Sequence, residues 1–505
     1  MSSDFNLSSR ALPAAMSEGE VGARAVQGSV VSVAASAITL ALGFVRLVLL
    51  ARLLPPEDFG LVTLAVFYVQ CAANQPRALG LRQAMIHHAG AHDALYDTYG
   101  TLRLGLAALS LGALSAAIPF VSRWYPSLPE LQAVMLVLVG VELVRTPALV
   151  QESLLIRVMA FRALAVADVV TAVLMTLVAS ALAWRGWGAW ALVAGQASGV
   201  CGRFLYVWVC YPQYRVRLGW DVRAARWFWS YGRPAWVATN LEFVASRFAD
   251  FWVGTVLGKG PLGYYSRAAE FAGYPRYIVL DPLVDVVLAT FARLQRDPVR
   301  LSHAFERAAS LIVRAGFWLA GGVVLVMPEF IALVIGNRWA PMLPTVRLFV
   351  VVMLLEALLG AGANLLLATG RPALLARVRL VQSMVIIPGV MIGSALAGIE
   401  GVALAVGGAM LAATLLLLAS LRRLVDVSPL QLLGAPLLAL CLGAAAVLSL
   451  EWVVTVGDLT RAVMKIATYS TCYLGCLVTI DRDQCRTLWL TTRQALLRAP
   501  AAREV

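Results

Sequence analysis

Four apolar segments of the sequence each carry a stripe of polar and charged side chains at helical spacing. At about 100° per residue, the members of each stripe fall within roughly a quarter-turn of one helix face. An ionised side chain at the centre of a bilayer costs roughly 2.5–3.5 kcal/mol on insertion scales, so such residues normally face a wet cavity or a partner. The four stripes therefore predict a polar cavity lined by the first, second, seventh and eighth apolar segments. They comprise Ser29, Ser32, Ser36, Thr39 and Arg46; Thr63, Gln70, Asn74 and Arg77; Arg233, Asn240, Arg247 and Asp250; and Arg267, Glu270, Tyr274, Tyr277, Asp281 and Asp285.

Two other interpretations of the stripes stay open. A Ser or Thr face on a membrane helix also serves close helix packing, which would account for the first stripe. Opposite charges can hide in internal salt bridges, and Asp250 is expected level with Glu270 or Arg267 because the seventh and eighth segments are joined by a tight turn. Arg276 projects from the opposite side of its predicted helix, while Asp168, Glu356 and Asn364 are single polar residues in other segments that could bind a cation.

Signatures of catalysis and of metal binding are weak. Residues 258–263 match GxGxxG formally, but they follow a membrane span and contain a proline where a phosphate-binding helix should begin. His87, His88 and His92 with Asp93 are better explained as a solvated loop than as zinc ligands. The pair Glu57–Asp58 resembles the acidic pair of membrane glycosyltransferases. Those enzymes also need a large external domain or loop, and the short gaps between the predicted spans leave no room for one. We therefore predict no catalytic residue, no metal site and no cofactor, so the protein is not expected to be an enzyme.

The elements that must position these side chains are membrane helices. Hydrophobic residues make up 60% of the 505 residues and charged residues only 14%, and the mean hydropathy is +0.80. Apolar runs of about 20 residues, long enough to cross a bilayer, recur about fourteen times along the chain, and they include 59–80, 372–397 and 399–424. The predicted fold class is an all-α polytopic membrane protein.

The formal charge of +13 is distributed unevenly. Most arginines lie in the even-numbered gaps between spans, and the short odd-numbered gaps hold few, although Arg461 and Lys465 run against this trend. The positive-inside rule then places both termini in the cytoplasm. Because the arginines lie where topology requires them, we expect no nucleic-acid partner. The scattered cysteines are expected to pack as small apolar residues.

Two parts of the chain are predicted to be copies of one six-helix unit. The turn Leu54-Pro55-Pro56-Glu57-Asp58-Phe59-Gly60-Leu61 and the turn Leu257-Gly258-Lys259-Gly260-Pro261-Leu262-Gly263-Tyr264 both place a glycine at the start of the next helix. An even number of spans per repeat gives parallel repeats, which transporters use for alternating access. The predicted divisions are a cytoplasmic N-terminus 1–27, an N-lobe 28–211, a cytoplasmic linker 212–232, a C-lobe 233–424, two extra helices 425–480 and a basic cytoplasmic tail 481–505.

Several short motifs resemble a known family. Ala51-Arg52-Leu53-Leu54-Pro55-Pro56-Glu57-Asp58-Phe59-Gly60-Leu61 is similar to the start of Wzx-type oligosaccharide flippases, the polysaccharide-transport branch of the multidrug/oligosaccharidyl-lipid/polysaccharide (MOP) exporter superfamily. Gly80-Leu81-Arg82-Gln83-Ala84-Met85-Ile86, the stretch 262–268 and the stretch 366–372 are further similarities. The resemblance covers residues 28–424.

This resemblance implies two six-helix lobes around a central cavity, two extra C-terminal helices and a bacterial inner-membrane location. The implied function is to move an undecaprenyl-pyrophosphate-linked oligosaccharide to the periplasmic leaflet for exopolysaccharide, capsule or O-antigen synthesis. A polysaccharide polymerase and co-polymerase are the implied protein partners, beside membrane lipids. The alternatives are a multidrug-type exporter of the same superfamily and an integral-membrane polysaccharide polymerase or ligase.

The resemblance also assigns roles to the stripe residues. Relatives carry cationic groups in the cavity, and the matching positions here are Arg46, Arg77, Arg247 and Arg267. Arginine donates bidentately to phosphate, which agrees with that role. Sugar hydroxyls suit Asn74, Asn240, Tyr274 and Tyr277. The candidates for binding a coupling proton or sodium ion are Asp250, Glu270, Asp281 and Asp285.

Overall fold

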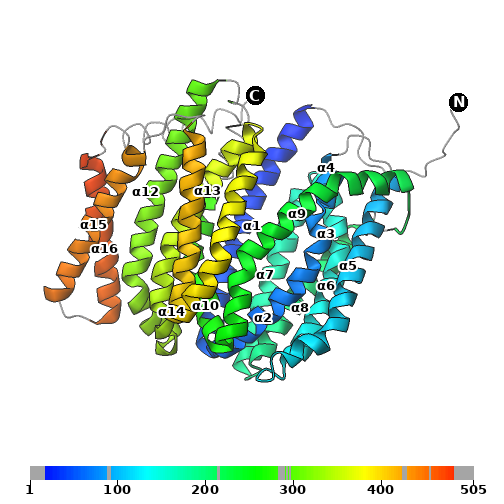
Figure 1. The fold of residues 1–505 in the computed structure, drawn as a ribbon, viewed down its shortest axis with the longest axis horizontal. Coiled ribbons are helices and arrows are strands. Elements are labelled where there is room, and N and C mark those ends of the chain that lie inside the picture. The colour runs from blue at the N-terminus through cyan, green and yellow to red at the C-terminus, as the bar shows by residue number, and fades with distance from the viewer. Residues whose placement is uncertain are drawn as a thin grey trace. The chain divides into compact units, whose positions relative to one another are not determined.

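The computed structural model describes residues 18–87, 93–212, 217–281, 297–422, 429–453 and 457–480, with the single residues 291, 294 and 482. Every regular element in these ranges is a helix (Figure 1). The chain divides into two compact units, residues 1–263 and 264–505, and each is considered by itself.

Nine helices of the described ranges are long and apolar enough to cross a membrane. The prediction of an all-α polytopic membrane protein is confirmed, whereas the count of about fourteen spans is not. One reason is that the charged helices at 222–252 and 259–275 are not among the nine. Another is that residues 372–421 count once, although Ala397 and Gly398 break that helix between two predicted spans.

Unit 1 contains the first group of helices. They are α1 (Glu18–Leu53), α2 (Pro56–Ala73), α3 (Gln75–Ala78), α4 (Leu81–His87), α5 (Asp93–Arg123), α6 (Leu131–Arg157), α7 (Phe161–Trp184), α8 (Ala189–Cys210), α9 (Val222–Trp252) and the π-helix η2 (Val253–Leu257). The helix α10 (Lys259–Pro275) begins in unit 1 and continues into unit 2.

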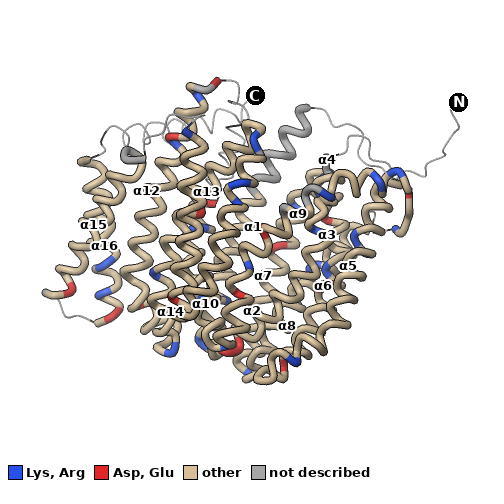
Figure 2. The backbone as a smooth tube through the Cα atoms, viewed as in Figure 1, with Lys and Arg blue, Asp and Glu red and all other residues tan. Residues whose placement is uncertain are grey.

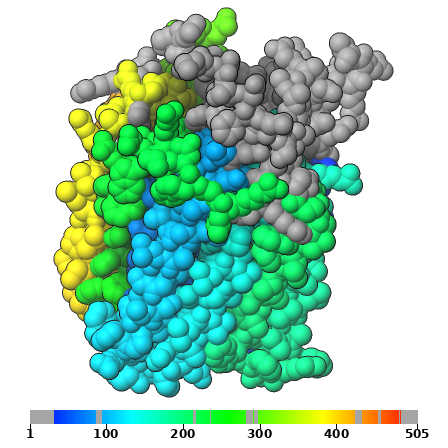
Figure 3. All heavy atoms as spheres, turned by 90° about the vertical axis from the view of Figure 1, so that its right-hand side faces the viewer, coloured from blue at the N-terminus to red at the C-terminus, as the bar shows by residue number. Residues whose placement is uncertain are grey.

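Small residues allow the helices of unit 1 to approach closely. A Cβ atom on Gly195 of α8 would lie 2.6 Å from the Cβ of Ala179 in α7, and one on Gly199 would lie 3.1 Å from the carbonyl oxygen of Thr171. Such spacing of small residues is typical of helix contacts inside membranes, where close van der Waals packing replaces the hydrophobic effect. Figure 3 shows the closely packed face formed by the blue, cyan and teal helices of this unit.

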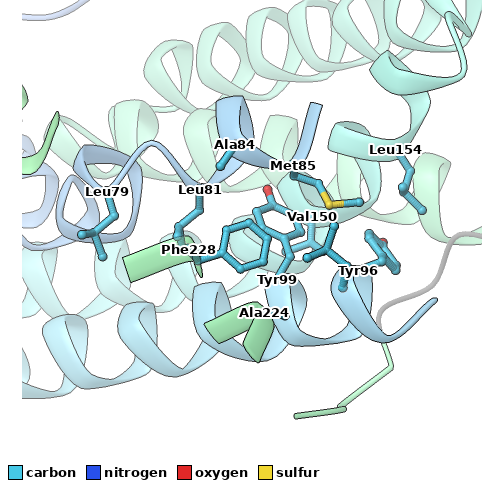
Figure 4. Packing of buried hydrophobic residues seen from close by; sticks show 11 residues of the cluster. Leu79, Leu81, Ala84, Met85, Tyr96, Tyr99, Val150, Leu154, Ala224 and Phe228 are labelled. Atoms are coloured by element: carbon cyan, nitrogen blue, oxygen red, sulfur yellow. The ribbon is translucent and has the colours of Figure 1, made fainter. Parts of the chain in front are cut away.

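The helix α9 begins at Val222, inside the stretch 212–232 that the sequence predicts as a linker. The Asp221 carboxylate accepts hydrogen bonds from the backbone N–H groups of Arg223 (2.7 Å) and Ala224 (3.3 Å), so it caps the helix at Val222. One turn apart, Ala224 and Phe228 enter an apolar cluster with Tyr99 (Figure 4). The cap and this buried pair extend the helix through most of the predicted linker.

Unit 2 contains the remaining helices. They are the π-helix η3 (Arg276–Leu280), α12 (Pro298–Phe330), the π-helix η4 (Ile331–Ile335), the 3-10 helix η5 (Asn337–Met342), α13 (Leu343–Ala368), α14 (Pro372–Leu421), α15 (Pro429–Val453) and α16 (Asp458–Ile480). The helices α15 and α16 lie side by side and both pack against α12.

Polar contacts attach α16 to α12 along its length. The hydroxyls of Tyr469 and Tyr473 donate to the carbonyl oxygens of Phe317 (2.8 Å) and Arg314 (2.9 Å). The buried ammonium of Lys465, one of the two residues that run against the charge trend, lies 2.6 Å from the Glu329 carboxylate and also pairs with Glu451 of α15. The extra helices predicted at 425–480 are therefore an integral part of unit 2.

Candidate functional site

Charged residues lie within the lengths of the helices as well as at their ends (Figure 2). The second predicted stripe ends at a break in the helix that carries it. Asn74 terminates α2, with its N–H 2.8 Å from the Gln70 carbonyl oxygen, and Pro76 lies in the short α3 that follows. The Asn74 Nδ2 atom is buried and has no hydrogen-bond partner among the residues that the structure describes. A buried amide donor without an acceptor is expensive, so an acceptor that reached this atom would be stabilised.

Arg77, three residues further on, faces a carboxylate that the stripes did not include. Its Nη2 atom lies 3.5 Å from Oε2 of Glu142 in α6, and Nη1 of Arg145 lies 3.0 Å from Oε1 of the same side chain. The Glu142 side chain is 6% exposed, whereas the side chains of Arg77 and Arg145 are 35% and 36% exposed. One buried carboxylate is thus shared by two half-buried guanidinium groups.

A third arginine adds to this positive charge. Arg103 of α5 is buried, its Nη1 donates to the Tyr99 hydroxyl at 2.8 Å, and it is close enough to Arg77 for electrostatic repulsion. No carboxylate of the described ranges forms a salt bridge with it. Three guanidinium groups and one carboxylate leave two positive charges. We call Asn74, Arg77, Arg103, Glu142 and Arg145 the Arg77 cluster.

Asn240, predicted to bind sugar hydroxyls, joins two parts of unit 1. Its Oδ1 accepts from Nε2 of Gln75 at 3.0 Å, and its Nδ2 donates to the Trp236 carbonyl oxygen at 2.9 Å. The Trp236 indole in turn donates to Oε1 of Gln75 at 3.0 Å. These bonds hold α9 against the α2–α3 segment, beside which its beginning lies in Figure 3.

The remaining predicted site residues of unit 1 lie on α1, α7 and α9, whereas the charged side chains of the Arg77 cluster lie on α3, α5 and α6. Arg46 lies on α1 and is partly buried. Arg247 and Asp250 form a salt bridge of 3.2 Å along α9, one turn apart. Asp168, a predicted cation ligand, pairs with Arg203 of α8, which also pairs with Glu152 at 2.6 Å.

In unit 2, the predicted residues of α10 and η3 are largely paired. Arg267 and Glu270 form an ion pair one turn apart. Tyr274 is buried, and its ring packs edge-on against that of Tyr277 with centroids 6.2 Å apart. Asp285 lies outside the described residues.

Arg276, which the helical spacing placed away from the stripe, instead pairs with a stripe residue. Its Nε lies 2.8 Å from Oδ1 of Asp281, its Nη1 pairs with Glu356 of α13, and its guanidinium lies 5.7 Å from the Tyr277 ring centroid. Residues 276–280 form a π-helix, whose i→i+5 hydrogen bond brings together side chains that an α-helix keeps apart. We call Arg276, Tyr277, Asp281 and Glu356 the Arg276 cluster; Arg379 of α14 also interacts electrostatically with Glu356, so two guanidinium groups lie near the two carboxylates.

The two turns that match in sequence also contact each other. A Cβ atom on Gly60 would lie 1.8 Å from the carbonyl oxygen of Lys259, and one on Gly263 would lie 1.9 Å from that of Pro56. Each glycine therefore meets the residue four positions before the other glycine. This reciprocal contact indicates local two-fold symmetry between the turns, and only glycine permits so close an approach.

Asp58 lies in the first of these turns, ahead of its predicted span. Burial raises the pKa of its carboxyl group, and the nearby Glu130 and Glu57 raise it further. Lys259 and a hydrogen bond from the Ala189 N–H at the start of α8 act in the opposite direction.

The residues described here contain no group of three or more His, Cys, Asp or Glu side chains that could hold a metal ion.

Comparison with solved structures identifies the class of fold. The chain is similar to the lipid II flippase MurJ in an inward closed conformation, with a TM-score of 0.74 at 13% identity over 91% of this chain and 99% of that one. It is also similar to an inward-facing multidrug resistance MATE family transporter of the MOP superfamily, with a TM-score of 0.60 at 15% identity over 78% of this chain and 98% of that one. The protein therefore has the fold of these membrane transporters.

Sequence comparison identifies the family. A family model described as "Polysaccharide biosynthesis protein" matches residues 49–344, more than half of the chain. The chain belongs to this polysaccharide biosynthesis protein family, which confirms the predicted resemblance.

Curated relatives carry related names. The succinoglycan biosynthesis transport protein ExoT of Rhizobium meliloti (strain 1021) is 29% identical over 318 residues, which cover 61% of this chain and 62% of that protein. The lipopolysaccharide biosynthesis protein WzxC of Escherichia coli (strain K12) is 28% identical over 173 residues, 34% of this chain and 35% of that protein. The matches thus span less than two thirds of these relatives.

Proposed function

We propose that this protein is a flippase for a lipid-linked oligosaccharide. It moves an undecaprenyl-pyrophosphate-linked repeat unit from the cytoplasmic to the periplasmic leaflet of a bacterial inner membrane by alternating access, for exopolysaccharide, capsule or O-antigen synthesis. The observation that carries the proposal is the excess positive charge of the Arg77 cluster inside a membrane helix bundle. Two positive charges with no carboxylate partner in the described part of the chain are costly unless an anion binds, and a diphosphate diester carries two negative charges.

The family and its relatives support the same substrate class. ExoT is named as a transport protein for succinoglycan biosynthesis and MurJ as a flippase for lipid II. In this proposal Arg77 and Arg145 hold the diphosphate, and Asn74 Nδ2 donates to a phosphate or sugar oxygen. Within unit 1, Arg46, Asn240 and Arg247 are further candidates for contact with the substrate; within unit 2, the candidates are Arg267, Tyr274 and Tyr277.

The Arg276 cluster brings two carboxylates to one arginine, which favours a coupling role. Asp281 and Glu356 are suited to bind a proton or sodium ion that resets the cycle; Asp250 and Glu270 are further candidates. Both chain termini lie in the cytoplasm in this proposal, and a polymerase with its co-polymerase would receive the exported unit.

Reconstitution tests the substrate class directly. The full chain is placed in liposomes with a fluorescent polyprenyl-diphosphate oligosaccharide, and an impermeant quencher reports the fraction in each leaflet. We expect protein-dependent exchange between the leaflets, with no transport of a fluorescent organic cation. Transport of the cation alone would favour the multidrug-exporter alternative, whereas elongation of the oligosaccharide would favour a polymerase.

A further inference from the structure

Glu142 makes two unequal contacts within the Arg77 cluster. Its contact with Arg145 is short, 3.0 Å, and joins residues one turn apart on α6. Its contact with Arg77 is longer, 3.5 Å, and crosses from α6 to α3. The Arg77 contact is thus the weaker of the two, and it depends on the position of a four-residue helix beside a break.

A carboxylate and a phosphate use the same guanidinium donors. A diphosphate oxygen that reaches the partly exposed Arg77 guanidinium competes with Oε2 of Glu142 for the N–H groups of that guanidinium. Losing Arg77 does not leave Glu142 as an uncompensated buried charge, because Arg145 remains 3.0 Å from Oε1. The exchange of partners at Arg77 is therefore inexpensive.

We propose that Glu142 is an intramolecular competitor of the substrate diphosphate for Arg77. This inference rests on the proposed function, and it adds Glu142 as a residue that limits the affinity of the protein for the substrate diphosphate. The apparent affinity of a ligand equals its intrinsic affinity multiplied by the fraction of molecules whose binding group is already free. By occupying Arg77 in the empty protein, Glu142 weakens binding and speeds release of the headgroup after translocation.

A positioning role for Glu142 predicts the opposite effect. If the carboxylate served only to orient Arg77, its removal would disorder the guanidinium and weaken anion binding. Competition predicts that removal strengthens binding. The charged side chains that pair with Glu142 are Arg77 and Arg145, and Arg103 lies close to Arg77, so the part of the gain that acts through Arg77 is found by removing Arg77.

The test is a double-mutant cycle on the purified full chain, with inorganic pyrophosphate as the probe in titration calorimetry. Removing the Glu142 contact with the partly exposed Arg77, worth about 1 kcal/mol, should make E142Q bind about fivefold more tightly than wild type. In the R77Q background, where only the contact with Arg145 is left, the same substitution should give a clearly smaller gain, and an undiminished fivefold gain would reject competition at Arg77. E130Q, which removes one negative charge next to the start of α6, is the matched control and should leave affinity within about twofold.

Each outcome separates the two proposals. Absence of pyrophosphate binding in wild type, E142Q and E130Q alike would reject the phosphate site of the proposed function. Binding by wild type that is unchanged or weakened in E142Q would reject the competition and leave the function standing. If E142Q does not fold, E142D replaces it, because its shorter carboxylate should lose the 3.5 Å contact first. A second readout is transport in liposomes, where E142Q should lower both KM and kcat.

Discussion

The Arg77 cluster of unit 1 and the Arg276 cluster of unit 2 use the same residue types in opposite salt-bridge arrangements. In the first, two arginines share one carboxylate and a third lies nearby; in the second, two carboxylates share one arginine. The guanidinium groups of Arg77 and Arg145 are half-buried, whereas the Arg276 side chain is only 20% exposed and is held by acids from two elements. The presence of an arginine in a membrane helix therefore does not by itself define a phosphate site. The number of carboxylates around the arginine decides whether positive charge is left to bind an anion.

The largest effect should follow from removing both accessible arginines of unit 1. Each charge-assisted hydrogen bond contributes about 1.5–3 kcal/mol, so R77A/R145A should reduce translocation at least about 100-fold. R276A is the matched substitution in unit 2 and should leave pyrophosphate affinity within about twofold. Liposome exchange and calorimetry measure the two quantities. Equal loss of pyrophosphate affinity in both variants would erase the distinction between the clusters.

The next effect concerns the coupling ion. E356Q removes one of the two carboxylates of the Arg276 cluster, so transport should lose its response to a proton or sodium gradient while pyrophosphate affinity stays within about twofold. The initial rate is measured with each gradient imposed and collapsed. E142Q, in the other cluster, is the comparison and should keep its response to the gradient. A normal response in E356Q would remove the coupling role from the Arg276 cluster.

A smaller effect, on stability, is expected at the glycine contact. G60A places a methyl group against a backbone oxygen and should destabilise unit 1 by roughly 1–3 kcal/mol. G105A in α5 is the control: its Cβ would have no neighbour within 4 Å, and alanine favours a helix by up to about 1 kcal/mol. Thermal unfolding in detergent should show a lower Tm for G60A and an unchanged or higher one for G105A. A stable G60A would mean that the two turns do not remain in contact.

The smallest effect should be a dependence of stability on pH through Asp58. Burial raises the pKa of this carboxyl in the folded protein. Its stabilising contribution is therefore fully present below the unfolded pKa and is lost as the pH rises through the folded pKa. In D58N the difference in Tm between acidic and neutral pH should become smaller. Identical pH profiles for D58N and wild type would contradict this assignment.

Much of the fold was accessible from sequence because apolar runs of membrane length have few alternatives to a helix. The break at Ala397 and Gly398, for example, falls between two predicted spans. The site was less accessible. The 100° rule placed Arg276 on the wrong side because it assumed an uninterrupted α-helix, and residues 276–280 form a π-helix. Arg145 and Glu142 were visible as charges in a span, but nothing in their spacing pointed to Arg77.

The sequence by itself determined that this chain forms membrane helices, which of them carry charge, and which two turns correspond. These properties depend on local composition and on residues close in the chain. Only the tertiary structure decided which arginine shares which carboxylate, because Arg77 and Glu142, or Arg276 and Glu356, meet through the packing of helices far apart in sequence. The interaction of two charges depends on their separation in space, so the charge balance of each cluster emerges only after folding.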